Sequence, residues 1–292
     1  MPSRDGYDAA RDADPHADDA GRRALRGPDG HVLLAYTTFE RVADGTPWAD
    51  HTWLPLGVSA GAAAERALEA LPGWLLSTDD AAYAAALVTR GAVEHRYAHT
   101  MTHDLDEARL PSTARSGTGS AVSLHPLSAA QVRRHAARLA DVHRRAYPAG
   151  HPDAIDGGTE ATVRYLRAIA DADVLGPLNP ASCLAVSEGC PLGACLVVDR
   201  PGAPPHAGPW VVDVFRDPGS PLSGVGAALL CHSLRAAAAA GLTALSLIVT
   251  DGNEPARRLY RWTGFVDVAQ SWTLALPQRA LPQRALPERA LP

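Results

Sequence analysis

The sequence predicts an α/β protein whose mixed, partly antiparallel sheet is flanked by helices and divided between two halves of the chain. Three observations lead to this fold class. Short apolar runs typical of strands alternate with longer segments whose apolar residues recur at helical spacing. A Ser/Thr/Gly/Pro-rich stretch, residues 108–120, separates an earlier series of such elements from a later, fuller one. Strands that alternate with helices are typical of α/β folds.

The composition excludes several classes of function. All 27 basic residues are arginine, so the chain has no lysine for a P-loop or for a Schiff base. The formal net charge of -5 argues against a nucleic-acid-binding surface. The four cysteines form no C-x-x-C pair and lie in apolar stretches, which favours buried free thiols over a metal site. We therefore expect no metal.

The two ends of the chain differ from its centre. Residues 1–29 are acidic and polar, and residues 278–292 consist largely of a five-residue unit, QRALP, QRALP and ERALP. We expect both ends to be disordered, because so short a unit cannot bury a face. The N-terminus has no apolar core of the kind that signal peptides carry, and a cytoplasmic location follows as the default expectation.

Residues 30–107 are predicted to form an N-terminal α/β domain. The segment 31–39 has a strand pattern, 60–71 is an Ala-rich helix, and 73–105 has the pattern of a strand, a helix and a strand. Residues 108–120 follow as a linker.

Residues 121–277 are predicted to form the second domain. Ser128 is the expected N-cap of a helix that runs to about residue 147, and Gly241 is the expected stop of another. In order, we expect strands and helices at 121–127, 128–147, 159–170, 182–200 (two strands joined by a tight turn), 208–218, 223–241, 242–249, 254–263 and 264–276.

The turn from the strand 208–218 into the helix that starts near Ser223 is the most promising site for chemistry. Gly224 and Gly226 would leave amide groups uncovered at a helix N-terminus, where a phosphate is favoured. A dinucleotide fold would require a third glycine where Leu229 stands, and an acidic residue about 20 positions later. Asp251 comes too late for that role, which makes dinucleotide binding the weaker reading.

Two longer motifs carry a more specific resemblance. These are V-F-x-x-P (Val214 to Pro218) followed by the G-x-G helix start, and N-x-x-A-x-x-L-Y-x-x-x-G-F (Asn253 to Phe265). In this order and spacing, residues 121–277 resemble the acetyl-CoA-binding core of the GNAT family of N-acetyltransferases. The resemblance implies that acetyl-CoA is the co-substrate.

The resemblance also implies a role for individual residues. Asn253 would bond the pantetheine arm, and Tyr260 would protonate the leaving thiolate. Backbone groups of the strand would meet the acetyl and pantetheine portion, and amides of the turn would hold the pyrophosphate; these fall on Val214, Phe215 and Arg216, and on Ser223, Gly224, Val225, Gly226 and Ala227.

General physical arguments are consistent with these roles. Acyl transfer to an amine needs a neutral nucleophile, donors for the developing oxyanion and an acid for the departing sulfur. Helical spacing over 254–263 turns Tyr260 inward together with Ala256 and Leu259. Asp213 is the candidate general base. Taken alone, an inward tyrosine is better explained by core packing, and only its place in the longer motif favours the catalytic role.

The chain departs from the family pattern at the turn. Family members usually carry Arg or Gln, two residues and then G-x-G, whereas Pro221, Leu222 and Ser223 precede Gly224 here. Proline has no N–H group, so this turn should offer one donor fewer to a pyrophosphate. In the loop after the first helix of this half, His151 and Asp153 are candidates for lining the acceptor pocket.

The N-terminal half is predicted to be a degenerate copy of the same unit. Aligning Gly91 with Gly264 places Asp80 at the position of Asn253 and Leu87 at the position of Tyr260. The scaffold would persist without the chemistry, although an unrelated α/β lid is an open alternative.

These patterns predict an N-acetyltransferase that moves an acetyl group from acetyl-CoA to an amine. A non-catalytic acyl-CoA-binding or scaffolding protein is the alternative, and the departure at Pro221 favours it. We expect a small-molecule or peptide amine as partner, no nucleic acid and no membrane, and leave a homodimer open. The sequence does not specify the acceptor.

Overall fold

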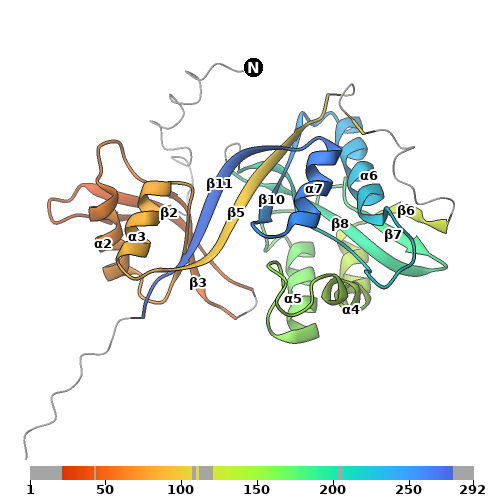
Figure 1. Cartoon of the computed structure of the whole chain (residues 1–292), viewed down its shortest axis with the longest axis horizontal. Coiled ribbons are helices and arrows are strands. Elements are labelled where there is room, and N and C mark those ends of the chain that lie inside the picture. Colours follow the sequence, from red (N-terminus) through yellow and green to blue (C-terminus); the bar gives the residue numbers. More distant parts are fainter. Residues whose placement is uncertain (1–21, 43, 107–109, 112–120, 203–205, 279–292) are drawn as a thin grey trace, which may run out of the picture.

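The computed structural model describes residues 22–42, 44–106, 110–111, 121–202 and 206–278 of the 292-residue chain (Figure 1). The disorder predicted for residues 1–21 and 279–292, and most of the predicted linker, lie outside these residues. The described chain forms one open 11-stranded sheet flanked by helices, which confirms the predicted mixed α/β fold class. Its strand order is β1-β2-β3-β4-β11-β5-β10-β9-β8-β7-β6.

The elements of the N-terminal half follow one another over about eighty residues. They are β1 (Arg23–Arg26), β2 (Val32–Glu40), β3 (Pro47–Trp53), α2 (Ala60–Ala70), β4 (Leu75–Thr78), α3 (Ala81–Thr89) and β5 (Val93–Asp104). The sequence patterns do not indicate β1 and β3. β1 falls within residues 1–29, for which the sequence predicts disorder, and β3 interrupts its apolar residues with Pro47, Asp50 and His51.

The C-terminal half contains all the elements expected from its sequence. They are β6 (Ser123–Pro126), α4 (Ala129–Ala146), α5 (Gly158–Ala170), β7 (Cys183–Ser187), β8 (Cys190–Arg200), β9 (Gly208–Arg216), α6 (Val225–Ala239), β10 (Ala244–Thr250), α7 (Glu254–Thr263) and β11 (Val266–Ala275). Ser128 caps α4 through a capping box with Gln131, as predicted for this position.

The two halves repeat the same order of elements. In the N-terminal half β1, β2, β3, α2, β4, α3 and β5 follow one another as β7, β8, β9, α6, β10, α7 and β11 do later. The pairing directions agree as well: antiparallel for the first two pairs in each half, then parallel for β3 with β4 and for β9 with β10. The N-terminal half has no counterpart of α4 and α5 among the described residues.

The aligned residues occupy equivalent places in α3 and α7. Asp80 and Asn253 are the N-caps, and each side chain accepts a hydrogen bond from a backbone amide of the first turn. Gly91 and Gly264 follow the helix ends with φ of 99° and 101°, a conformation that favours glycine. The predicted repeat therefore has a matching local geometry, while its origin as a degenerate unit stays a prediction.

The last strands of the two halves are interleaved. β5 of the N-terminal half pairs with β10, β11 of the C-terminal half pairs with β4, and β5 and β11 pair with each other at the centre of the sheet. Figure 1 shows these two long strands running side by side between the two lobes. Neither half has a complete sheet without the other.

Three buried clusters fill the layers of the molecule. In the C-terminal half, one cluster lies between the sheet and α6 and α7 and includes Met101 and Leu247, while a second lies under α4 and α5 and includes Trp210. In the N-terminal half, a cluster around Leu34 and Leu76 lies under α2 and α3. The helices α4 and α5 thus cover the opposite sheet face from α6 and α7, but only in the C-terminal half.

The cysteines are free thiols. Cys183, Cys195 and Cys231 are buried, as predicted, but Cys190 is exposed because it opens β8 at the tight turn after β7. Burial raises the pKa of the Cys183 thiol from its ordinary 9.0 to about 12.

This raised pKa predicts a loss of stability in alkali. The thiol of Cys183 ionises near its ordinary pKa in the unfolded chain and only near 12 in the folded one. Below pH 9 the protonated thiol therefore makes its full contribution to the free energy of unfolding. Between pH 9 and 12 the free energy of unfolding falls by about 1.4 kcal/mol per pH unit for each such thiol. Urea unfolding of wild type and of Cys183→Ala across this range should show a shallower fall for the variant. Cys190→Ala is the control and should keep the wild-type slope.

Candidate active site

The candidate site lies where β9 and β10 part. Their parallel pairing covers only Trp210 opposite Ser246 and Val211 opposite Leu247, although β9 continues to Arg216 and β10 to Thr250. The β8–β9 register shifts between Leu196 and Val197, which leaves one extra residue in β9 at this point. The bulge turns β9 away from β10 and opens a wedge in the middle of the sheet.

Backbone groups of β9 face this wedge in alternation. Asp217 donates its amide proton to the carbonyl of Leu192, so the groups of Val214 and Arg216 face away from β8 and toward the wedge. The groups of Phe215 face β8 instead, and its side chain is buried under α4 and α5. Of the three strand residues predicted to meet the acetyl and pantetheine portion, Val214 and Arg216 therefore offer backbone groups.

A cluster of amides without acceptors begins α6. Gly224 precedes the helix with φ of 74° and supplies no side-chain cap. Within the described part of the chain, no acceptor is given for the amides of residues 223–227. Together with the helix dipole these amides form a site suited to an anion such as a pyrophosphate. All five residues predicted from the sequence for this role lie here: Ser223, Gly224, Val225, Gly226 and Ala227.

The preceding residues are held in a different way. The amide of Leu222 donates to the hydroxyl of Ser220, and the Leu222 side chain packs against the core under α6, while Pro221 is exposed. Pro221 thus lies at the edge of the anion site, and the amides of residues 223–227 are unaffected by its lack of an N–H group.

Replacing Pro221 with Arg should therefore tighten CoA binding. The variant gains an amide donor and a guanidinium beside the anion site, and one charge-assisted hydrogen bond contributes roughly 1.5–3 kcal/mol before ordering costs. We expect the Kd for CoA to fall about tenfold by calorimetric titration. Pro277→Arg, at an exposed position near the end of β11, is the control for added charge. A weaker or unchanged affinity would show that the loop does not approach the anion.

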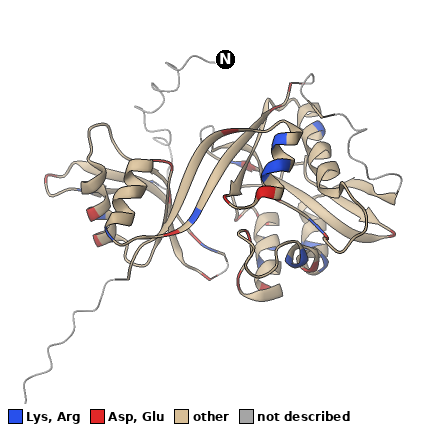
Figure 2. Cartoon of the chain, in the orientation of Figure 1, with Lys and Arg blue, Asp and Glu red and all other residues tan. Residues whose placement is uncertain are grey.

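Helix α7 borders the other side of the wedge. Figure 2 shows an acidic residue at its start and basic residues further along, an order that complements the helix dipole. The Asn253 side chain accepts from the Ala256 amide at 3.3 Å and donates to Asp153 at 2.8 Å. One of its two amide protons is therefore engaged in this structure, and the other is left for the bond to the pantetheine arm that the family resemblance implies.

Tyr260 projects inward from α7, as its position in the helix predicts. It is 7% exposed, its ring lies 5.9 Å from that of Phe265, and it lines the cleft described below. No partner is given for its hydroxyl among the described residues. Burial raises the pKa of this phenol well above its ordinary 10.0, and nearby Cys195, Asp213 and Asp153 act in the same direction. The hydroxyl stays protonated, as a general acid requires.

Asp213 lies across the wedge in a buried polar group. Its Oδ2 is 2.9 Å from Nε2 of His143, and its Oδ1 accepts a hydrogen bond from the Tyr147 hydroxyl at 3.1 Å. Tyr147 also donates to the carbonyl oxygen of Val214 at 2.8 Å. Burial and the charge of Asp213 raise the pKa of Tyr147, so it remains a donor. Residues at the C-terminal end of α4 thus fix the position of the Asp213 carboxylate beside β9.

A second polar group fixes the α4–α5 loop over the end of β10. Asp153 accepts hydrogen bonds from the hydroxyl of Thr250 and from Asn253, and it lies 3.6 Å from a guanidinium nitrogen of Arg96. Arg96 donates to Thr250 at 2.7 Å. Because Arg96 belongs to β5, the N-terminal half contributes directly to this end of the wedge. The ring of the second predicted loop residue, His151, packs against Tyr147.

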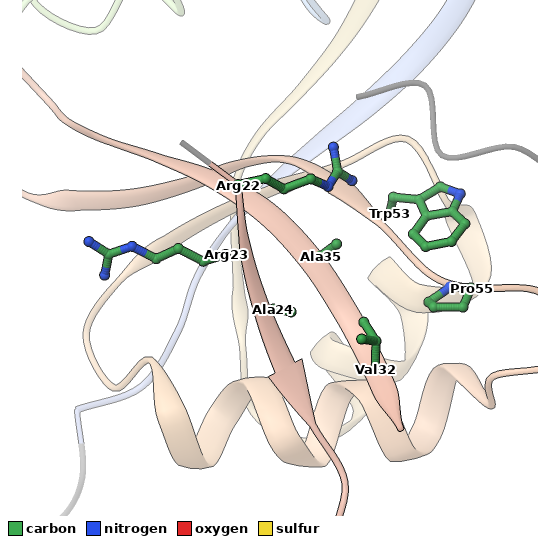
Figure 3. A pocket seen from close by; sticks show the side chains of 7 residues that line it. All are labelled: Arg22, Arg23, Ala24, Val32, Ala35, Trp53 and Pro55. Atoms are coloured by element: carbon green, nitrogen blue, oxygen red, sulfur yellow. The ribbon is translucent and has the colours of Figure 1, made fainter. Parts of the chain in front are cut away.

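A cleft of about 1980 Å³ joins these groups to the N-terminal half. It is lined on one side by Asp213, Tyr147 and Tyr260, and on the other by side chains of β2, β3 and β4. A second, smaller hollow of about 430 Å³ lies at the outer strands of the sheet. Figure 3 shows the side chains that line it, among them Arg22, Trp53 and Pro55.

The sequence analysis did not identify Arg96, His143, Tyr147 or Thr250. His143 and Tyr147 lie four residues apart on the last turn of α4, a spacing that could have signalled one shared face. No such signal exists for Arg96, which reaches the site only because β5 is inserted beside β10.

Residues 139–265 match the family model described as the acetyltransferase (GNAT) family. The chain contains a GNAT-family domain. This match includes the wedge, the α6 turn and α7, so it agrees with the resemblance found in the motifs. Members of this family are generally acyltransferases that use acetyl-CoA or another acyl-CoA. No curated protein matches the sequence significantly.

Solved structures with the same fold cover nearly the whole chain. A GCN5-related N-acetyltransferase from Sphaerobacter thermophilus is similar over 89% of this chain and 82% of its own, with 16% identity and a TM-score of 0.58. A GCN5-related N-acetyltransferase from Kribbella flavida is similar over 90% and 94%, with 17% identity and a TM-score of 0.54.

One further structure resembles this chain over both halves. It is a tandem GNAT protein from the clavulanic acid biosynthesis pathway, similar over 89% of this chain and 85% of its own, with 13% identity and a TM-score of 0.56. At these identities the likeness concerns the fold alone.

The described residues contain no group of three or more His, Cys, Asp or Glu side chains that could hold a metal ion. No helix within the described ranges is long and apolar enough to cross a membrane.

Proposed function

We propose that the chain transfers an acetyl group from acetyl-CoA directly to an amine at the wedge between β9 and β10. The proposal rests on a gap between β9 and β10, a set of amides without acceptors at the α6 N-terminus, and a Tyr260 hydroxyl in the cleft that has no partner among the described residues. These features fit the three parts of the co-substrate: a pantetheine arm, a pyrophosphate and a thioester.

The α6 amides of residues 223–227 would hold the pyrophosphate, and the backbone of Val214 and Arg216 would bond the pantetheine and acetyl portion. When bound, acetyl-CoA supplies an activated acyl group. Its pantetheine arm can occupy the wedge because β9 and β10 do not pair with each other there. The exposed backbone groups of a sheet edge readily accept such an added segment.

In the transfer step an N–C bond forms to the acetyl carbon and the C–S bond breaks. The ammonium group of the acceptor first loses a proton, for which Asp213 is the candidate base, with His143 and Tyr147 positioning its carboxylate. The departing thiolate takes a proton from Tyr260, whose hydroxyl is protonated and has no partner among the described residues, and the second proton of the attacking nitrogen restores that hydroxyl. The amide of Val214 is a candidate donor to the carbonyl oxygen as it gains negative charge.

The co-substrate is expected to bind in one half only. In the N-terminal half β3 and β4 also part after two residue pairs, but the Thr52 hydroxyl bridges this gap by donating to the carbonyl of Ser77 at 2.7 Å. We therefore expect one molecule of acetyl-CoA per chain.

The test is amine-dependent release of free CoA thiol by the whole chain. A panel of amines that differ in length and charge is supplied with acetyl-CoA, and the acetylated product is measured beside the thiol. Equal amounts of thiol and acetylamine are expected from at least one amine. Tight acetyl-CoA binding without any amine-dependent release would support the non-catalytic binding protein instead.

A further inference from the structure

One face of the N-terminal half is not covered by any helix of the described residues. Side chains of β2, β3 and β4 alternate between two faces. Leu34, Ala49 and Leu76 lie under α2 and α3, whereas Phe39 and Trp48 face the opposite side and line the cleft. This face is open because the N-terminal half has no counterpart of α4 and α5.

A row of polar side chains crosses this face toward the wedge. Trp48 on β3 donates its indole proton to the Ser77 hydroxyl on β4 at 2.8 Å, and Ser77 lies 3.1 Å from the hydroxyl of Thr273 on β11. Thr273 is opposite Arg96 on β5, which in turn donates to Thr250 at the end of β10. The row therefore connects the outer strands to the residues that border the candidate acetyl site.

The sheet spacing sets the length of this row. From Trp48 on β3 to Thr250 on β10 it crosses β4, β11 and β5, which makes four steps between neighbouring strands. At about 4.8 Å per step, Trp48 lies roughly 19 Å from the wedge.

At the far end of the row is an aromatic platform formed by Phe39 and Trp48. The two rings stack with centroids 4.9 Å apart and planes inclined by 26°. The bond to Ser77 fixes Trp48, and Phe39 is 42% exposed, which is unusual for so large an apolar side chain in a cleft wall. A fixed, accessible ring pair offers a flat surface on which another planar group can stack.

The charge and size of the cleft indicate the kind of molecule it accepts. Nine carboxylate side chains and three guanidinium groups line it, so a cationic ligand is favoured. Its volume of about 1980 Å³ exceeds the roughly 300–1,000 Å³ that is usual for a small-molecule site. A pantetheine arm and a simple alkylamine would leave much of it unfilled.

We propose that the platform is an acceptor subsite, and that the acceptor is an elongated cationic amine with a planar group roughly 19 Å from its reactive nitrogen. The amine lies at the wedge between Tyr260 and Asp213, and its body follows the polar row to Phe39 and Trp48. This inference rests on the proposed acetyl transfer and adds the class of acceptor to it.

The test uses peptides as rulers. A series of eight-residue Gly/Ser peptides has one free α-amine and a single Trp at position 2, 3, 4, 5, 6 or 7, beside a Trp-free peptide. An extended chain advances about 3.4 Å per residue, so kcat/KM should be highest when Trp follows the N-terminus by about five or six residues.

The variant Phe39→Ala removes half of the platform at a partly exposed position. It should lower kcat/KM about tenfold for the best peptide and leave the Trp-free peptide unchanged. Phe39→Tyr should retain the preference, and Val88→Ala, at an exposed position on α3, is the matched control. The acetyl-CoA affinity should be the same in all four proteins.

If kcat/KM does not depend on the position of Trp, or if Phe39→Ala lowers kcat/KM equally for every peptide, the platform is not an acceptor subsite. If short amines are acetylated and no peptide is, the acceptor class is wrong while the acetyl transfer stands. If neither is acetylated although acetyl-CoA binds, both the inference and the proposed function fail.

Discussion

Tyr260→Phe is expected to lower kcat by about 10²–10⁴-fold while leaving the affinity for acetyl-CoA almost unchanged, because a general acid contributes about that much. The substitution keeps the ring that packs beside Phe265 and removes only the hydroxyl. Since no hydrogen-bond partner is given for that hydroxyl in the described structure, the free energy of unfolding should change little. Steady-state and single-turnover rates with acetyl-CoA and a competent amine provide the measurement.

Tyr83→Phe is the matched control for this experiment. Tyr83 is a buried tyrosine of α3 in the N-terminal core, and its hydroxyl also has no hydrogen-bond partner in the structure. The same substitution there should leave kcat at the wild-type value. If Tyr260→Phe keeps kcat within a fewfold of wild type while the chemical step limits the rate, Tyr260 is a core residue and not the acid.

The second large effect is expected from separating the two halves. A fragment of residues 121–277 would lose β5, so β11 would lose both of its partners, β4 and β5, and β10 would keep only its short pairing with β9. Exposed strand edges of this length favour aggregation. We expect neither this fragment nor residues 22–111 to fold alone, by circular dichroism and cooperative unfolding.

Co-expression of the two fragments tests whether each fails to fold because it lacks the strands that the other supplies. The same two fragments, produced together, should co-purify and recover acetyl-CoA binding, because the exchanged strands restore one continuous sheet. A fragment 121–277 that folds and binds acetyl-CoA alone would contradict the role given to β5.

The motifs in the sequence predicted those parts of the site that depend on local structure. Asn253 caps α7, Gly264 ends it, and Tyr260 faces inward, because each follows from helical geometry within a dozen residues. The uncovered amides after Gly224 follow in the same way from a strand-to-helix turn without a capping side chain.

The parts that were not predicted depend on contacts between distant segments. β5 and β11 have the same place in their halves, so no local pattern reveals that each pairs with the other half. Arg96 enters the site through this exchange. β3 was missed because its inward Ala49 is flanked by polar residues and tryptophans, and its open face carries the side chains that line the cleft.

The wedge and the α6 N-terminus of the C-terminal half are expected to hold one acetyl-CoA. Calorimetric titration of the whole chain with acetyl-CoA, CoA and NAD measures this binding. We expect one equivalent of acetyl-CoA or CoA per chain and no binding of NAD. Two equivalents, binding of NAD, or no binding of acetyl-CoA would rule out this single site.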